Sequence, residues 1–175
     1  MSLDSAARRV AHLLKATDNK VAFAESCTGG LVSAALTKIP GVSSFHCGGM
    51  VVYRNETKMA YLGIAAAVLE DPGPVSREVV ELMARGVLQK TPEADFAAAV
   101  TGHLGPNSPP KLNGLVFAAV AWRGGGRHAP VKIKRLRCQR DDSRVTRQRW
   151  VAEQVLELLG DELQRARDDA TGRTT

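Results

Sequence analysis

The sequence predicts an α/β protein: a three-layer α/β/α sandwich with a mixed, mostly parallel central sheet. Strand-like and helical segments alternate over the first half of the chain, as in strands joined by crossover helices. The last two strand-like segments follow each other with only a glycine-rich connection between them, which indicates an antiparallel pair. Together these two patterns predict a sheet of mixed direction.

Five helices are expected. Apolar side chains recur at helical spacing in segments 3–14, 31–37, 76–87 and about 141–165. Ser76 is a suitable N-cap for the third of these, and Pro40-Gly41 ends the second. A short further helix that carries Lys58 is expected to begin with Asn55 as its N-cap.

Five strands are expected between these helices. They fall at residues 21–24, 44–53, 96–100, 114–122 and 129–136. The pair Gly48-Gly49 in the second strand permits a bulge or a close backbone approach. The glycine-rich stretch 123–127 is expected to be a flexible, hairpin-like connection between the last two strands.

Length and composition predict one folded domain. The chain has 175 residues, 44% of them hydrophobic and 24% charged, which is typical of a globular protein with a single substantial core. We assign residues 1–165 to this domain and expect residues 166–175 to form a polar, disordered tail.

Several protein classes are disfavoured. The chain has no apolar run long enough to span a membrane and no secretory signal, so a cytoplasmic location is expected. Its three cysteines (Cys27, Cys47 and Cys138) are odd in number and lack Cys-x-x-Cys spacing, which argues against a disulfide framework and a zinc site. The histidines are also scattered, so no metal centre is expected.

The basic character of the chain has a local origin. The net charge is +6, and basic side chains crowd into residues 132–149. Lys132 and Lys134 alternate with Val131 and Ile133, the pattern of an exposed strand face that protects a sheet edge. Few aromatic residues interleave with these charges, which disfavours nucleic-acid binding, whereas an anionic small substrate explains part of the excess equally well.

Three polar segments follow predicted strands and point to a catalytic site. They are residues 26–30, 53–58 and 101–106, each at the carboxyl end of a strand, where open α/β folds gather their sites. A desolvated Lys58 is a plausible base for the hydroxyl of Ser26, as in a Ser/Lys amidohydrolase. The structural alternative is that the serine turn only caps a helix and that Lys58 is solvated; Cys27 as the nucleophile is a minor variant.

These residues resemble a known family, the C-terminal domain of CinA competence/damage-inducible proteins, which also occurs as stand-alone nicotinamide-mononucleotide deamidase. The string Glu-Ser-Cys-Thr-Gly-Gly at 25–30 joined to Tyr-x-Asn-x-x-Lys at 53–58 is a specific signature. Val75-Ser76 and Val100-Thr101-Gly102 extend the match, which spans about residues 3–160.

The resemblance implies hydrolysis of the carboxamide of nicotinamide mononucleotide to nicotinate mononucleotide and ammonia, for NAD recycling. By this analogy Ser26 attacks the amide carbon, Lys58 accepts its proton, and Tyr53 and Thr101 orient the reacting groups. No metal or cofactor is required, and a dimer or trimer is expected. The residues expected to bind substrate are Cys27, Thr28, Gly29, Gly30, Asn55, Gly102 and Gly105. The backbone N–H groups of residues 28–30 are candidates for binding either the oxyanion or the substrate phosphate.

One loop departs from the family pattern. After Thr101-Gly102 the chain reads His-Leu-Gly-Pro-Asn-Ser-Pro-Pro, without the later glycine pair that similar proteins have. Bulkier and stiffer residues there predict a change in substrate scope or activity. His103 is either a new substrate contact or a loop residue without function. The alternative to the enzyme is a catalytically silent nucleotide-binding or interaction module linked to competence or DNA damage.

Overall fold

The computed structural model describes residues 1–124, 129–139 and 141–172. These residues contain a five-stranded sheet in the order β2-β1-β3-β4-β5. The strands are β1 (Val21–Glu25), β2 (His46–Val51), β3 (Phe96–Gly102), β4 (Leu115–Trp122) and β5 (Val131–Arg137). β1 pairs in parallel with β2 and β3, whereas β4 pairs antiparallel with β3 and β5. Four of these strands therefore run one way and β4 runs against them, which confirms the mixed, mostly parallel sheet.

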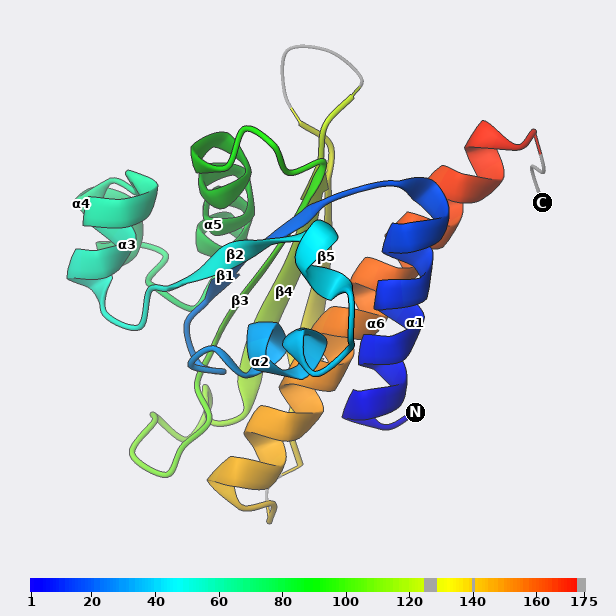
Figure 1. Cartoon of the computed structure of the whole chain (residues 1–175). Coiled ribbons are helices and arrows are strands. Elements are labelled where there is room, and N and C mark those ends of the chain that lie inside the picture. The colour runs from blue at the N-terminus through cyan, green and yellow to red at the C-terminus, as the bar shows by residue number, and fades with distance from the viewer. Residues whose placement is uncertain (125–128, 140, 173–175) are drawn as a thin grey trace.

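Helices cover both faces of the sheet (Figure 1). One face packs against α1 (Leu3–Thr17), α2 (Leu31–Thr37) and α6 (Arg144–Ala170), and the 3₁₀ helix η1 (Val42–Ser44) leads from that layer into β2. The other face packs against α5 (Arg77–Lys90), with α3 (Asn55–Leu62) and α4 (Ala66–Glu70) beside it. The predicted three-layer α/β/α architecture is confirmed.

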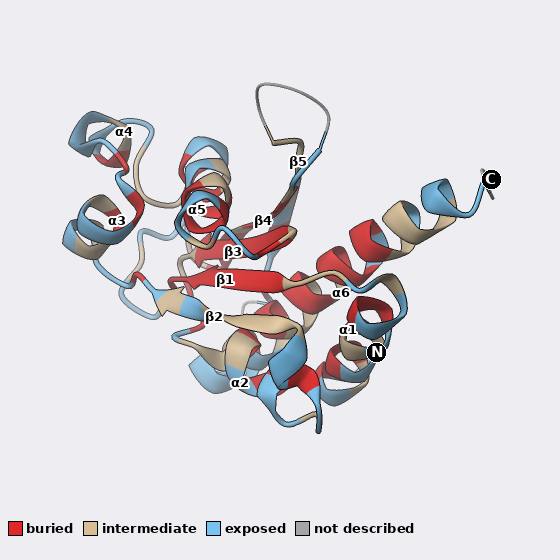
Figure 2. Ribbon diagram, turned by 45° about the horizontal axis from the view of Figure 1, so that its top comes forward, coloured by how far each residue is buried: buried red, intermediate tan, exposed pale blue. Residues whose placement is uncertain are grey.

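The two faces of the sheet differ in side-chain size. Toward α1 and α6 the strands present large residues such as Phe23 and Val116, whereas toward α5 they present mainly alanines. β1, β3 and β4 are largely buried and the edge strands are more exposed (Figure 2). On the α5 side the helices also approach closely, because a Cβ added at Gly86 would lie 3.0 Å from the carbonyl oxygen of Leu62.

Serine caps begin three of the helices. The hydroxyls of Ser2, Ser76 and Ser143 accept hydrogen bonds from backbone N–H groups in the first turns of α1, α5 and α6. The predicted cap at Ser76 is confirmed. The predicted cap at Asn55 is wrong by one residue: Arg54 occupies the N-cap position, and its N–H donates to Thr57 Oγ1 at 3.2 Å.

The glycine pair in β2 does form a bulge. Val21 of β1 pairs with His46 and the next residue, Ala22, pairs with Gly48, so Cys47 is the extra residue. Gly48 has φ +134°, a backbone conformation that favours glycine.

The end of α6 differs from the sequence-based expectation. The helix runs to Ala170, so residues 166–170 are helical rather than part of a tail. Ala166 packs against the core, and Gln164 donates to Asp168 at 2.8 Å one turn later, which explains the extra length. Two expected segments lie wholly or partly outside the described residues. They are the tail, at residues 173–175, and the connection between the last two strands, most of which falls within residues 125–128.

β5 forms one edge of the sheet and carries the two lysines expected there. Lys134 reaches over α6 and donates to Gln154 Oε1 at 3.0 Å. The interpretation of this segment as a charged edge strand is confirmed.

None of the described helices combines the length and the apolar character that crossing a bilayer requires.

Candidate active site

A cavity of about 300 Å³ lies at the carboxyl ends of β1, β2 and β3, where the three polar segments of the sequence meet. It is lined by residues from five parts of the chain: Ser26, Cys27, Tyr53, Asn55, Lys58, Pro74, Val75, Thr101, Gly102, His103, Leu104, Gly105, Asn107, Ser108 and Arg144. The structure thus brings together eight of the eleven residues proposed from the sequence. Thr28, Gly29 and Gly30 are not among the lining residues.

Ser26 and Lys58 form the polar centre of this cavity. Ser26 follows the last residue of β1, and its N–H is fixed by the carbonyl oxygen of Val100 at 3.0 Å. Lys58 lies in α3, and its Nζ is 3.1 Å from Ser26 Oγ and 3.0 Å from the carbonyl oxygen of Val52. Both side chains are buried, with Lys58 only 2% exposed.

Burial sets the electrostatics of this pair. Desolvation lowers the pKa of Lys58 below its ordinary value, and no ion pair among the described residues includes this lysine. The carbonyl groups and the hydroxyl around Nζ provide hydrogen bonds but no counter-charge. A neutral Lys58 amine is placed to accept the proton of the Ser26 hydroxyl, which is the requirement for an activated serine.

Glu25 was not proposed from the sequence, yet its carboxylate organises the turn that carries Ser26. The group is 2% exposed and accepts four hydrogen bonds. The donors are the Thr28 hydroxyl at 2.6 Å and the backbone N–H groups of Gly30, Val32 and Ser33 at 3.0, 3.1 and 2.8 Å. The N-terminus of α2 is thus satisfied by a carboxylate of the chain itself.

This arrangement changes the role of the Thr-Gly-Gly segment. The Gly30 N–H that was expected to bind an oxyanion or a phosphate donates to Glu25, and the Gly29 N–H donates to the carbonyl oxygen of Ser26 at 3.1 Å. Gly29 and Gly30 have φ +64° and +100°, so glycine is needed here for the shape of the turn.

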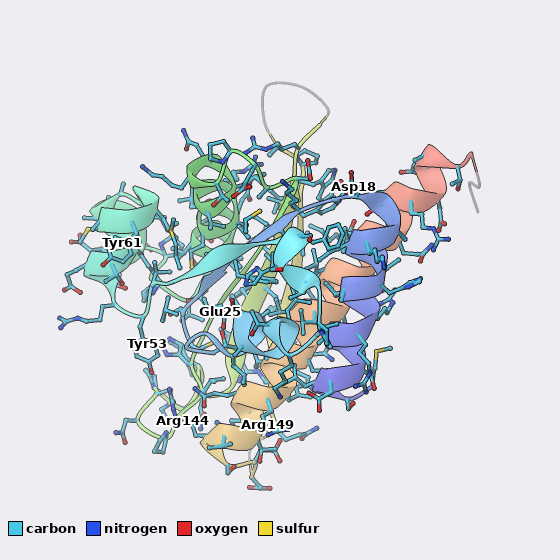
Figure 3. The ribbon with its side chains drawn as sticks, viewed as in Figure 1. Asp18, Glu25, Tyr53, Tyr61, Arg144 and Arg149 are labelled. Carbon is cyan, nitrogen blue, oxygen red and sulfur yellow. The ribbon has the colours of Figure 1, made fainter. Side chains whose placement is uncertain are left out.

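Arg144 also lines the cavity, although the sequence analysis did not propose it as a site residue. It stands in the first turn of α6 and donates to Tyr53 Oη at 2.8 Å and to the carbonyl oxygen of Gly105 at 2.7 Å. Figure 3 shows Tyr53 and Arg144 close together at the same end of the molecule. Tyr53 is 54% exposed, so its ring forms part of the rim of the cavity.

Two further arginines of the basic segment hold the loop that follows β3. Arg147, 4% exposed, donates to the carbonyl oxygen of Leu104 at 3.1 Å and to Asn113 Oδ1 at 2.6 Å. Arg137 donates to the carbonyl oxygens of Lys111 and Asn113. Part of the positive charge crowded into residues 132–149 therefore serves to fix the loop of residues 103–113.

Thr101 and Gly102 connect β3 to the wall of the cavity. The Thr101 hydroxyl donates to the carbonyl oxygen of Pro74 at 2.8 Å, which ties the end of β3 to the segment before α5. A Cβ at Gly102 would lie 2.6 Å from Val116 Cγ2, so the contact between β3 and β4 leaves no space for a side chain. Asn55 lines the cavity from the start of α3.

Cys27 is chemically quiet in this environment. The residue is 3% exposed, and burial is the main cause that raises the pKa of its thiol to about 12. The group is a thiol at neutral pH, so the structure favours Ser26 over Cys27 as the nucleophile.

Within the described residues, no three His, Cys, Asp or Glu side chains are grouped in a way that suits a metal ion.

The fold and the cavity define an α/β protein with a buried Ser/Lys pair at the carboxyl ends of parallel strands. The chain belongs to the family of CinA C-terminal domains, whose sequence model matches residues 3–163. The assignment made from the 25–30 and 53–58 motifs is confirmed.

Curated relatives carry the same family names. The chain is 40% identical over 153 residues to a CinA-like protein of Geobacter metallireducens, a match covering 84% of this chain and 36% of the relative. It is 45% identical over 114 residues to a putative competence-damage inducible protein of Moorella thermoacetica, covering 64% and 27%. The matches thus span about a third of the length of these relatives.

Solved structures agree over almost the whole chain. The competence/damage inducible protein CihA of Agrobacterium tumefaciens superposes with a TM-score of 0.84 at 35% identity, covering 93% of this chain and 95% of the other. A CinA superfamily protein of Klebsiella pneumoniae gives 0.85 at 28% identity, covering 94% and 99%.

Proposed function

We propose that the chain is a metal-independent amidohydrolase that converts nicotinamide mononucleotide to nicotinate mononucleotide and ammonia. The observation that carries the proposal is the buried contact of 3.1 Å between Lys58 Nζ and Ser26 Oγ. A serine hydroxyl becomes a useful nucleophile only when an adjacent base removes its proton, and Lys58 is the basic group in contact with Ser26 Oγ.

The proposed reaction has two stages. In the first, Ser26 Oγ bonds to the carboxamide carbon while its proton passes to Lys58. The tetrahedral intermediate then collapses, the C–N bond breaks, and Lys58 returns the proton to the leaving nitrogen, which departs as ammonia. In the second stage Lys58 takes a proton from a water molecule, whose oxygen bonds to the acyl carbon of the Ser26 ester. The bond from that carbon to Ser26 Oγ then breaks, Lys58 returns the proton to Oγ, and nicotinate mononucleotide is released.

The cavity has features that suit a pyridine nucleotide. Its volume of about 300 Å³ is at the lower end of the range for small-molecule sites, and it opens at a rim that carries Tyr53 and Arg144. A guanidinium group favours the phosphate of the substrate, and an exposed aromatic ring offers a stacking face for the pyridine ring. The α2 N-terminus is less suited to the phosphate, because Glu25 already accepts from its N–H groups.

A second candidate function is a catalytically silent nucleotide-binding or interaction module. It is favoured by the altered loop 103–110, which forms one wall of the cavity, and by the competence-damage names of the relatives. This alternative predicts that the purified protein binds the nucleotide without releasing ammonia.

The test is ammonia release from nicotinamide mononucleotide by the wild type, Ser26→Ala and Lys58→Met, with and without a chelator. Ser43→Ala and Lys38→Met are matched controls, because both residues are exposed and neither lines the cavity. The proposal expects chelator-resistant turnover by the wild type and both controls and none by the two cavity variants. A folded wild type that binds the nucleotide and releases no ammonia would leave the silent module as the function.

A further inference from the structure

His103 lines the cavity, but the proposed hydrolysis reaction gives it no role. It lines the cavity directly after Thr101-Gly102. Its imidazole makes no hydrogen bond with any described residue, whereas the Thr101 hydroxyl is already bonded to Pro74. The side chain therefore brings unused hydrogen-bonding capacity into the cavity.

The backbone of His103 is held firmly. Its N–H donates to the carbonyl oxygen of Leu115 at 2.8 Å, and its carbonyl oxygen accepts from the Gly114 N–H at 2.7 Å. These two bonds extend the antiparallel ladder between β3 and β4 beyond Gly102. His103 is thus part of the rigid sheet rather than of a freely moving loop, which is the condition for a precise contact with a ligand.

Strand alternation places His103 on the same wall of the cavity as Thr101. Ala97 and Ala99 face α5, Thr101 bonds to Pro74 before α5, and His103 is the next residue in this alternation. Arg144 enters from α6, which packs on the opposite face of the sheet. The cavity therefore has a cationic wall and a wall that carries an imidazole.

The imidazole is suited to an uncharged partner. Partial burial lowers the pKa of His103, so the ring is neutral at physiological pH and offers one N–H donor and one nitrogen acceptor. A hydroxyl group also both donates and accepts, whereas a phosphate is better served by Arg144. Because the carboxamide has to lie against Ser26, the part of a nucleotide left for His103 is the sugar.

We propose that His103 is a specificity-determining residue that hydrogen-bonds a ribose hydroxyl of the nucleotide substrate. This inference rests on the proposed function in that it takes a pyridine nucleotide as the substrate. It assigns a sugar contact to the residue that directly follows Thr101-Gly102 in the cavity wall.

Binding is the sharpest test, since it does not depend on turnover. Ser26→Ala protein is titrated calorimetrically with nicotinamide mononucleotide and with its 2′-deoxy and 3′-deoxy analogues, and the same titrations are made with Ser26→Ala/His103→Ala. We expect His103→Ala to weaken binding of the natural nucleotide about 3- to 10-fold, as for one neutral hydrogen bond. The weakening should disappear for one of the two deoxy analogues, because that analogue lacks the hydroxyl that His103 binds.

Two variants serve as controls. His103→Gln keeps a donor and an acceptor and should restore most of the affinity, and His12→Ala, an exposed residue of α1, should bind like the parent. Equal affinities with and without His103, or an equal loss for all three nucleotides, would overturn the inference.

The outcomes also separate this inference from the proposed function. Ammonia release by the wild type together with binding that is insensitive to His103 would contradict the sugar contact alone. Hydroxyl-selective binding through His103 without ammonia release would contradict the amidohydrolase alone. No binding of the nucleotide by any variant would contradict the inference.

Discussion

The side-chain nitrogen of Lys58 lies 3.1 Å from the hydroxyl oxygen of Ser26, although the two residues are 32 positions apart in the chain. The sheet itself brings them together. The N–H of Val52, directly after β2, donates to the carbonyl oxygen of Glu25 at 2.8 Å, which extends the parallel pairing of β1 and β2 up to the cavity. α3 starts three residues later and carries Lys58 back over the end of β1.

Lys58→Met should abolish most of the activity while leaving the protein folded. Methionine fills a similar volume without an amine, so the cavity loses its proposed base, and no ion-pair partner of Lys58 is left with an unpaired charge. We expect kcat/KM for the nucleotide to fall about 10²- to 10⁴-fold, the usual contribution of a general base. Circular dichroism and a thermal melt check the fold; a variant that keeps more than about a tenth of the activity would show that Lys58 is not the base.

The activity should rise with pH. In the proposed mechanism the base is the neutral amine, and burial lowers the pKa of Lys58 from 10.5, so kcat/KM should increase as the pH approaches that lowered value and level off above it. The free energy of unfolding should also rise with pH between the folded pKa and 10.5, because there the unfolded chain binds the proton and the folded chain does not. Lys58→Met should remove this contribution to the slope. A pH–rate profile that is flat over this range would contradict the assignment.

Cys27 should be dispensable for catalysis. Because burial raises the pKa of its thiol to about 12, almost no thiolate is present at neutral pH, and alkylation at this residue should be slow. Cys27→Ala should therefore keep kcat within a few-fold of the wild type. The opposite pattern, an active Ser26→Ala and a rapid loss of turnover on alkylation, would make Cys27 the nucleophile.

Glu25 should matter for stability as well as for activity. Glu25→Ala removes the acceptor of four hydrogen bonds at the start of α2, and we expect the free energy of unfolding to fall by at least about 2 kcal/mol in a urea titration. Glu56→Ala is the matched control, since that carboxylate is exposed and accepts hydrogen bonds from the exposed side chain of Arg54. If the two variants unfold at the same urea concentration, Glu25 does not hold the turn in the way described.

The sequence was sufficient for the parts of the site that depend on local pattern. Ser26, Lys58 and Thr101 each follow a strand that the hydrophobic pattern predicts, and the carboxyl ends of parallel strands meet at one edge of a sheet. Their convergence could therefore be inferred before any contact was known. The bulge in β2 was readable only in part: the glycine pair indicated either a bulge or a close backbone approach, and the register shows a bulge with Cys47 as the extra residue.

The residues that the sequence missed depend on long-range packing or on an ambiguous motif. Arg144 bonds to Tyr53 across 91 positions, and nothing in the basic segment distinguishes it from its arginine neighbours. Glu25 lies at the end of a buried strand beside a Ser-x-Thr-Gly-Gly turn, which could equally have left its N–H groups to a ligand. Only the structure shows that these backbone N–H groups donate to the Glu25 carboxylate. The short helix α4 was also missed, because its five residues are too few to show a periodic pattern.

The most direct test of the central claim, that Ser26 is the nucleophile, is an acid quench of the reaction with nicotinamide mononucleotide followed by mass spectrometry of the peptides. Hydroxylamine is added in a parallel reaction to capture an acyl-enzyme as the hydroxamate. The account predicts a nucleotide ester on Ser26 or the corresponding hydroxamate in the wild type, and neither in Ser26→Ala, which should also release no ammonia. Turnover by Ser26→Ala at the wild-type rate, or an adduct on Cys27, would contradict it.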